Sequence, residues 1–372
     1  MTTHPTTTGT LDVLRRDPET ELLLADVDDT LEQVLEELGS ILHEVGGELV
    51  DTSVGSLAVD LVDELAQRLR HPGKRLRPLL TGWGWAVAGG RSDTREELVR
   101  VAAALELLQL FALVQDDVMD RSDERRGRPA LHVVATERHV AEEGLGDAQL
   151  FGDSVAVLVA DLALSEATLL ASAGTRRVAR AWRVMATELV EGQLLDVTHT
   201  AGRGRDLAVS RRIGRLKSGR YTITRPLELG ALVAGAAPEV VASLVVWGDL
   251  VGDAFALRDD LLGVWGDPGL TGKPAGDDLR CGKPTVLLVW AAEMLPERHH
   301  HLLEACDAGT LDADGVLALR KAMRSCGVRE RAEAAIADLV ERSHEAVERI
   351  DTDDETRAAL RELAHAIGWR SA

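Results

Sequence analysis

Apolar residues recur at the three- and four-residue spacing of an amphipathic helix almost everywhere after Asp29. Runs in which apolar and polar residues alternate, as they do in half-buried strands, are hard to find. Aromatic residues form only 3% of the chain, and the interior rich in Ala, Leu and Val that remains suits closely packed helices. The pattern predicts an all-α protein, with helices over residues 31–45, 57–69, 96–119, 155–170, 179–195, 240–262, 285–294 and 329–350.

The domain organisation is predicted to be simple. The first ten residues are rich in Thr and contain little that could be buried, so residues 1–25 are expected to form a flexible tail. No shift in composition and no long linker rich in Pro, Gly or Ser divides the rest of the chain. We therefore expect residues 26–372 to form a single large helical bundle.

Charge and cysteine content exclude several classes of protein. The chain has 42 Lys and Arg against 62 Asp and Glu, a net charge of −20, and nucleic-acid binding depends on clustered cations, so no nucleic-acid partner is expected. The most apolar stretches, residues 101–114 and 154–164, contain Glu106 and Asp161 and are too short to cross a bilayer, so no integral membrane segment is expected. Three widely spaced cysteines offer no disulfide framework, which favours a cytoplasmic location.

Three aspartates close the apolar helix predicted over residues 96–119. Asp116 and Asp120 are four residues apart and share one face of the helix, with Asp117 beside them. A helix C-terminus already carries partial negative charge, so these carboxylates repel it and one another unless a cation compensates. Oxygen ligands favour a hard divalent cation, above all Mg²⁺, which binds one or two carboxylates and completes its shell with water and phosphate. A solvated acidic helix end is the alternative for an isolated cluster.

A second aspartate pair strengthens the hypothesis of a metal site. Asp259 and Asp260 end another strongly apolar helix, and Gly263 stands where a third carboxylate would follow. Each cluster runs into a loop that contains basic residues, Gly and Pro. In a bundle, two such helices can face each other across the mouth of one cavity and hold a metal-bridged polyanion between them.

Basic residues gather in three loops, where they could bind a polyanion. Arginine suits bidentate contact with phosphate, and lysine supplies a mobile point charge. The three groups are Lys74, Arg75 and Arg77; Arg125, Arg126 and Arg128; and Lys273. Ordinary surface ion pairing is the alternative for any one group, but all three together favour a polyanion site.

Several motifs follow one another between about residue 73 and residue 285. They are GKRLRP from Gly73, LLQLFALVQDDVMD from Leu107, RRGRP from Arg125, GQLLD from Gly192, KSGRY from Lys217, RDDLLGVWGDP from Arg258 and TGKPAGDDLRCGKPTVLL from Thr271. In this order they resemble those of the trans-isoprenyl diphosphate synthases, which include the farnesyl and geranylgeranyl diphosphate synthases. The resemblance implies an all-α bundle of the isoprenoid synthase type with a central cavity, and a homodimer.

The resemblance also implies roles for individual residues. The implied ligands of several Mg²⁺ ions are Asp116, Asp120 and Asp259, supported by Asp117 and Asp260. The implied contacts of an allylic diphosphate are Arg125, Lys217 and Lys273. Those of isopentenyl diphosphate are Lys74, Arg77, Gln109 and Arg126. Gln109 lies two helical turns before Asp116 on the same face, where a buried amide needs a partner.

The implied reaction is a prenyl transfer. The allylic diphosphate ionises, the double bond of isopentenyl diphosphate attacks the resulting cation, and loss of a proton gives a product longer by one isoprene unit. Mg²⁺ and cationic side chains would stabilise the departing diphosphate. Because water would capture the carbocation, the apolar cavity would also serve the chemistry.

Two departures from the family pattern leave alternatives open. Ala256 stands where the family usually has Gln, and Gly263 replaces the third aspartate. One alternative is a terpene cyclase of the same fold, which would need no site for isopentenyl diphosphate. The other is a catalytically weak regulatory subunit, which Ala256 favours and which the two aspartate pairs and the basic residues oppose.

The expected product is the C20 compound geranylgeranyl diphosphate. Ala112 lies about 6 Å deeper than Asp116 on nearly the same helix face, so this small residue should border the growing chain. Leu108, about 12 Å below Asp116, is a candidate for the cavity floor. The resemblance instead stresses Phe111, where an aromatic followed by a small residue is similar to the geranylgeranyl-producing pattern. Phe111 lies about 140° from the Asp116 face, so the two interpretations support C20 through different residues.

Overall fold

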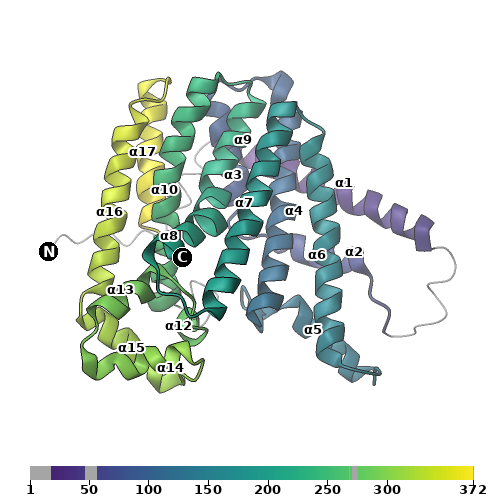
Figure 1. Ribbon diagram of the computed structural model, residues 1–372. Helices are drawn as coiled ribbons and strands as arrows, with labels where there is room; N and C mark the ends of the chain where they lie inside the picture. The colour runs from purple at the N-terminus through teal and green to yellow at the C-terminus, as the bar shows by residue number, and fades with distance from the viewer. Residues whose placement is uncertain (1–17, 47–56, 268, 270–274, 372) are drawn as a thin grey trace.

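The computed structural model describes residues 18–46, 57–267, 269 and 275–371. Long helices make up nearly all of this part of the chain (Figure 1), as the all-α prediction requires. The main helices are α1 (Pro18–Gly46), α2 (Leu61–Leu69), α3 (Leu76–Val87), α4 (Arg95–Asp120), α5 (Leu131–Ala141), α6 (Ala148–Ser172), α7 (Arg176–Ala201), α8 (Leu207–Ile213), α9 (Arg225–Val233), α10 (Pro238–Trp265), α12 (Asp277–Arg280), α13 (Val286–Met294), α14 (His300–Asp307), α15 (Ala313–Ser325), α16 (Val328–Val347) and α17 (Asp354–Gly368). Short 3₁₀ turns, η3 (Ser92–Thr94) and η5 (Glu297–His299), precede α4 and α14.

Two differences from the sequence prediction concern local structure. A two-stranded antiparallel hairpin, β1 (Glu124–Arg125) and β2 (Arg128–Pro129), follows α4. Its turn residues, Arg126 and Gly127, both have positive φ angles, 55° and 70°, as the tight turn of a two-residue hairpin requires. The strands are too short to show an alternating pattern in the sequence.

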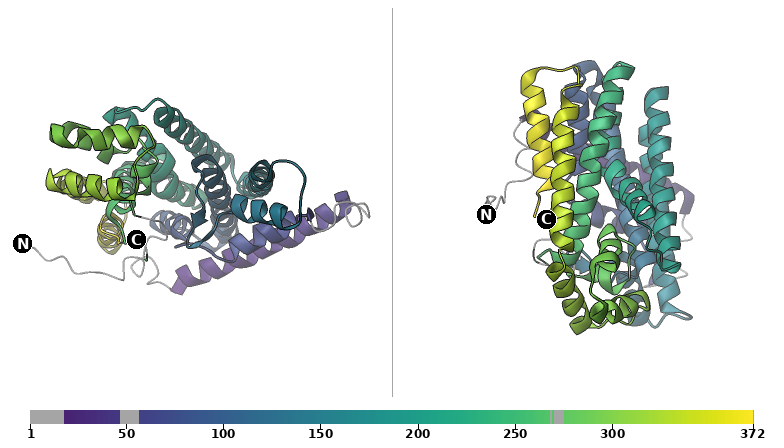
Figure 2. Two further views of the ribbon diagram at one scale, coloured as in Figure 1. Left: turned by 90° about the horizontal axis from the view of Figure 1, so that it is seen from below. Right: turned by 60° about the vertical axis from the view of Figure 1, so that its left-hand side comes forward.

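The predicted tail also ends earlier than expected. Helix α1 begins at Pro18, inside the 1–25 segment, and Leu23 and Leu24 are buried in the core. Figure 2 shows α1 lying along one side of the bundle. The start of this helix was not predicted, because the Thr-rich start of the chain lacks the helical apolar pattern, which is clear only after Asp29.

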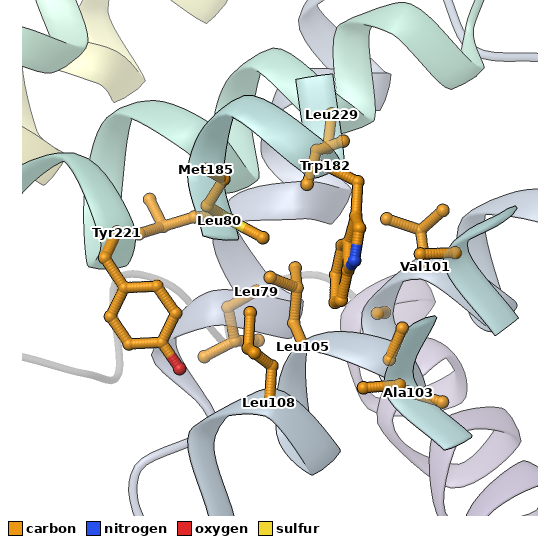
Figure 3. Packing of buried hydrophobic residues seen from close by; sticks show 14 of the residues in the cluster. Leu79, Leu80, Val101, Ala103, Leu105, Leu108, Trp182, Met185, Tyr221 and Leu229 are labelled. Carbon is orange, nitrogen blue, oxygen red and sulfur yellow. The ribbon is translucent and has the colours of Figure 1, made fainter. Parts of the chain in front are cut away.

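Two apolar cores meet along α10. Its first half contributes Trp247 and Val251 to the larger core, to which α1–α7, α9, α16, α17 and the segment between α8 and α9 also contribute. Its second half contributes Leu257 and Leu261 to a smaller core formed with α12–α16. Figure 3 shows part of the larger core, in which Leu108 and Leu105 of α4 lie near Leu79. α10 and α16, which pack together and contribute to both cores, join the two parts of the bundle.

The chain between α8 and α9 forms an uncommon π-helix, η4 (Gly214–Thr224). It packs against α10 and α7 at glycines, where the backbones approach too closely for a side chain. A Cβ on Gly219 would lie 2.6 Å from the carbonyl oxygen of Gly252, and one on Gly192 would lie 2.7 Å from the backbone nitrogen of Lys217. π-helices often occur at functional sites, and η4 carries Lys217 and Tyr221.

The apolar stretches of helices α6 and α10 are longer than the sequence predicts. In the described part of the chain, these two are long and apolar enough to cross a membrane by length and composition alone. The apolar stretches had been expected to be too short. Each helix buries one face, α6 against α4 and α5, and α10 against η4 and α16.

Candidate active site

Helices α4 and α10 both carry their aspartates at their C-terminal ends, which lie at the lower side of Figure 1, toward α5 and α12. α4 ends at Asp120, as the sequence predicts, and Arg121 closes it in the left-handed conformation with φ of 54°. Asp117 is buried, and the side chains of Asp116 and Asp120 are largely shielded from solvent. The aspartate cluster of α4 is therefore not simply a solvated helix end.

Lys217 of η4 joins α4 to α7. Its Nζ donates to Oδ1 of Asp116 at 2.9 Å and to Oδ2 of Asp196 at 2.6 Å. Asp196 is itself buried on α7. The π-helix thus places one ammonium group between two shielded carboxylates.

Lys283 supplies a second ammonium group to the same cluster. Its Nζ donates to Oδ2 of Asp120 at 2.6 Å and lies 4.0 Å from Oδ1 of Asp278. Burial alone would lower the pKa of Lys283, but Asp278, Asp120 and Asp116 outweigh burial and raise this pKa. Lys283 is therefore held in its charged form.

The β1–β2 hairpin turns Arg125 back onto the end of α4. Arg125 Nε donates to Oδ1 of Asp117 at 2.7 Å, and its Nη2 donates to Oδ2 of Asp116 at 3.1 Å. Burial alone would raise the pKa of Asp116, but Lys217, Lys283 and Arg125 together hold this pKa well below its ordinary range. The cation compensation expected at this helix end is supplied here by three side chains of the protein.

The residues fit a hard divalent cation that shares its shell with a ligand. Asp116 and Asp120 offer carboxylate oxygens as ligands one helical turn apart. In the described residues, no group of three or more His, Cys, Asp or Glu side chains gathers closely enough to hold a metal ion. Mg²⁺ commonly binds one or two carboxylates and completes its shell with water and phosphate, so this donor set suits Mg²⁺ together with a diphosphate.

Ion pairs on the far side of η4 fix the position of Lys217. Arg220 forms a bidentate pair with Asp249 of α10, at 3.0 and 2.6 Å, and also donates to Glu188 of α7 at 2.7 Å. Arg225 donates to both carboxylate oxygens of Glu188, at 2.7 and 2.6 Å. Bidentate arginine–carboxylate pairs constrain geometry strongly, so η4 is anchored to both neighbouring helices.

The second aspartate pair has a different environment. Asp259 is paired with Arg370, which follows α17. Burial raises the pKa of Asp260 well above its ordinary range, and the nearby carboxylates of Asp278 and Asp259 add to the effect. A cation bound beside Asp260 would relieve this repulsion.

Two residues expected to bind isopentenyl diphosphate meet at the one tyrosine of the chain. Tyr221 of η4 donates to Oε1 of Gln109 at 3.0 Å, and the Arg77 guanidinium stands 4.2 Å from the centre of the Tyr221 ring. Arg77 also donates to the Thr222 hydroxyl at 2.7 Å. Gln109, predicted to be buried, is half-buried, and its amide has Tyr221 as a partner.

Glu106 of α4 draws the remaining basic residues together. Arg75 donates to it at 3.1 Å, and the positive charges of Arg77 and Arg126 also act on its carboxylate. Burial and the neighbouring charge of Arg370 lower the pKa of Lys74, with a smaller lowering by Arg126. Arg75 is buried and held by Glu106 and Asp28, so it anchors the loop.

The expected length-determining residues differ in burial. Ala112 is half-buried, one turn below Asp116, whereas Leu108 is fully buried and Phe111 is 8% exposed. Leu108 and Phe111 both belong to the larger core. Helix α4 thus presents a small side chain first and a large, tightly packed one beneath it.

Some members of the cluster were not singled out by the sequence. Asp196, Tyr221 and Lys283 fall within the GQLLD, KSGRY and CGKPT segments, which were the signal available, but their partners lie far away in the chain. No sequence signal pointed to Arg370. Lys273, an expected diphosphate contact, lies outside the described residues.

Comparisons of the sequence and of the structure with known proteins point to one family. The family model of the polyprenyl synthetases matches residues 59–323. A geranylgeranyl pyrophosphate synthase from Corynebacterium glutamicum, solved with isoprenyl diphosphate and magnesium, has 36% identity, covers 92% of this chain and 97% of its own, and superposes with a TM-score of 0.83. The (2E,6E)-farnesyl diphosphate synthase of Mycobacterium tuberculosis is 32% identical over 81% of this chain and 80% of its own. The geranylfarnesyl diphosphate synthase of Aeropyrum pernix is 34% identical over 62% of this chain and 70% of its own.

Proposed function

The chain belongs to the polyprenyl synthetase family of prenyltransferases, and we propose that it condenses isopentenyl diphosphate with allylic diphosphates to make geranylgeranyl diphosphate. One observation carries the proposal. The aspartate-rich end of α4 holds a cluster of ammonium and guanidinium groups, in which Lys217 and Lys283 pair with Asp116 and Asp120. Asp260 of α10 feels the charges of Asp278 and Asp196, which adjoin the same two lysines. A shielded site with both charge signs suits a diphosphate and its counter-ions.

We propose that Asp116, Asp120 and Asp259 hold Mg²⁺. When bound, Mg²⁺ would neutralise the diphosphate and make it a better leaving group. Lys217, Lys283 and Arg125 already stand beside these carboxylates and carry positive charge, so they can bind the oxygens of the departing diphosphate. Asp117 and Asp196 would keep Arg125 and Lys217 in position.

A separate group of cations would bind isopentenyl diphosphate. Arg77 and Arg126 lie beside Glu106, Lys74 lies near Arg126, and Gln109 adjoins Arg77 through Tyr221. This division places one diphosphate at the aspartates and the other beside the α3 loop, so that the two substrates can react with each other. A cyclase would have no use for the second group.

The C20 product length is supported by α4. Ala112 leaves room one turn below Asp116, and the packed Leu108 can end that room one turn further down. Relatives with farnesyl, geranylgeranyl and geranylfarnesyl names differ in product length, so family membership alone does not select C20.

The departure at Ala256 is compatible with activity. Ala256 is buried, and its Cβ lies 3.4 Å from the place that a Cβ on Gly214, at the start of η4, would take. Because Ala256 and Gly214 are both small, α10 packs close to the π-helix that carries Lys217. The usual Gln is therefore missing at a position where the two helices pack closely beside the proposed site.

We also propose a homodimer that forms through α6. The solvent-facing side of this helix exposes Leu150, Val157, Leu158 and Leu169, with Asp161 as a charged residue among them. Contiguous apolar surface of this kind is typical of an interaction face. Sedimentation equilibrium of the wild type and of Val157→Glu tests this, and a wild-type monomer would reject it.

The activity is tested by product analysis with isopentenyl diphosphate and each of dimethylallyl, geranyl and farnesyl diphosphates. We expect Mg²⁺-dependent release of diphosphate only when both substrates are present, with a C20 product. Asp116→Ala should lower turnover about a hundredfold or more, as loss of a preorganised electrostatic group does. Release of diphosphate from an allylic substrate alone would indicate a cyclase. Near-normal turnover of Asp116→Ala at limiting Mg²⁺ would refute the assignment of Asp116 as a metal ligand.

A further inference from the structure

Arg370 is a buried cation that the reaction described above does not use. It follows α17, only 7% of the residue is exposed, and its guanidinium pairs with Oδ1 of Asp259. The side chain of Asp259, in contrast, is 53% exposed. A buried cation thus holds one oxygen of a carboxylate whose remainder faces solvent.

The guanidinium is fixed from several directions. Its Nη2 donates to the carbonyl oxygen of Phe255 at 3.2 Å, and its Nη1 donates to that of Ile367 at 3.2 Å. Its central carbon stands 3.8 Å from the centre of the Phe255 ring. Arginine is suited to such a site, because it offers several donors in one rigid plane and stacks on aromatic rings.

The backbone beside Arg370 is also tied to α10. Arg258 Nε donates to the carbonyl oxygen of Arg370 at 2.7 Å, and the Arg258 guanidinium lies 6.0 Å from the centre of the Trp369 ring. The segment after α17 therefore docks on the same turn of α10 that begins the second aspartate pair. Asp259 receives its partner from a part of the chain far from every motif of the family.

We propose that Arg370 is a positioning residue for Asp259, holding Oδ1 so that Oδ2 is presented to a divalent cation. The proposal rests on the assignment of Asp259 as a metal ligand made above. A carboxylate that binds a cation is commonly held by a hydrogen-bond donor on its other oxygen, and loss of that donor weakens metal affinity about ten- to a hundredfold. No other described residue bonds to Asp259, so its orientation depends on Arg370.

The test is a titration of the full chain with Mn²⁺ in the presence of inorganic diphosphate, followed by electron paramagnetic resonance. The variants are Arg370→Met, Asp259→Asn and the double variant, with Arg370→Gln as a second, milder change. Arg361→Met is the matched control, because Arg361 lies on α17 and pairs with Glu348 at the surface. Thermal unfolding without metal checks that each variant is folded.

We expect Asp259→Asn to remove one class of Mn²⁺ site. Arg370→Met should weaken that same class about tenfold or more, the double variant should be no worse than Asp259→Asn, and Arg361→Met should match the wild type. Unchanged binding by folded Arg370→Met and Arg370→Gln would overturn the inference and leave Asp259 as a ligand. Tighter binding would also overturn it, since Arg370 would then compete with the cation. Full binding by Asp259→Asn would refute the ligand assignment as well.

Discussion

The carboxylate of Asp278 fills the space beside Gly263 into which a side chain at position 263 would project. Gly263 lies in the last turns of α10, one helical turn after Asp259, and Asp278 comes from α12. A carboxylate from another helix therefore occupies the space into which a third aspartate at position 263 would project.

This relationship predicts a reduced effect for a common substitution. Gly→Ala within a helix ordinarily stabilises by up to about 1 kcal/mol. At position 263 the new methyl group would displace the Asp278 carboxylate, which lies 4.0 Å from Lys283 Nζ, and this displacement should offset part of the gain. We expect Gly263→Ala to raise the free energy of unfolding less than Gly39→Ala does, measured by urea denaturation.

Two further variants make the comparison specific. Gly39 lies in α1 with nothing within 4 Å of an added Cβ, so Gly39→Ala should stabilise the protein. Asp278→Ala should remove the obstacle, so that adding Gly263→Ala to it should stabilise the protein as Gly39→Ala does. If Gly263→Ala stabilised the protein as Gly39→Ala does, the packing of Asp278 against Gly263 would be wrong.

Tyr221 predicts a distinctive titration. Burial raises the pKa of Tyr221 to about 12, above its value near 10 in an unfolded chain. A raised folded-state pKa gives stability that is fully present below the unfolded pKa and is lost as pH rises through the folded pKa. We therefore expect this contribution to fall between about pH 10 and pH 12.

The measurement is unusually direct, because the chain contains one tyrosine. Phenolate absorbance should rise near pH 12 in the native protein and near pH 10 in urea, and Tyr221→Phe should show neither step. The same variant loses the 3.0 Å hydrogen bond to Gln109, which should cost about 0.5–1.5 kcal/mol. A native step near pH 10 would contradict the burial of the hydroxyl.

The sequence predicted the long helices and the end of α4 to within one residue, because both signals are local, whereas α10 continues past its aspartates to Trp265. Apolar spacing identifies a helix face, and the aspartates at positions 116 and 120 follow that face to its end. Cation compensation at Asp116 was also foreseeable from electrostatics. What compensates it was only partly foreseeable, since Lys283 is 163 residues from its partner Asp120.

The remaining features depend on how helices approach one another. The π-helix that carries Lys217 rests on close backbone contact between Gly219 and Gly252, and the sequence contains no local signal for that contact. Arg370 reaches Asp259 only because α17 packs beside α10. Such partners follow from the assembled bundle and not from any spacing within a segment.

Separate diphosphate sites predict separate kinetic effects. Lys74 lies near Arg126, Arg370 and Asp259, whereas Lys217 pairs with Asp116, so Lys74→Ala should raise the KM for isopentenyl diphosphate about tenfold and change that for the allylic substrate less. Lys217→Ala should mainly lower kcat, because Lys217 adjoins the proposed leaving group. Initial rates with each substrate varied in turn measure both. Equal loss of affinity for the two substrates in Lys74→Ala would reject the division.

Product length should depend on the volume at position 112. Ala112 is half-buried one turn below Asp116, whereas Leu108 is fully buried in the core beneath it, so a larger side chain at 112 would close the space before Leu108 does. We expect Ala112→Val, Ala112→Leu and Ala112→Phe to shift the product progressively from C20 toward C15, as measured by chromatography of the dephosphorylated prenols. Phe111→Ala separates the two explanations of length: Phe111 faces about 140° away from Asp116 and is packed in the core, so its truncation should destabilise the protein by about 3–5 kcal/mol and lengthen the product little. Longer products from a folded Phe111→Ala would transfer the control of length to that residue, and an unchanged distribution in Ala112→Phe would reject the role of Ala112.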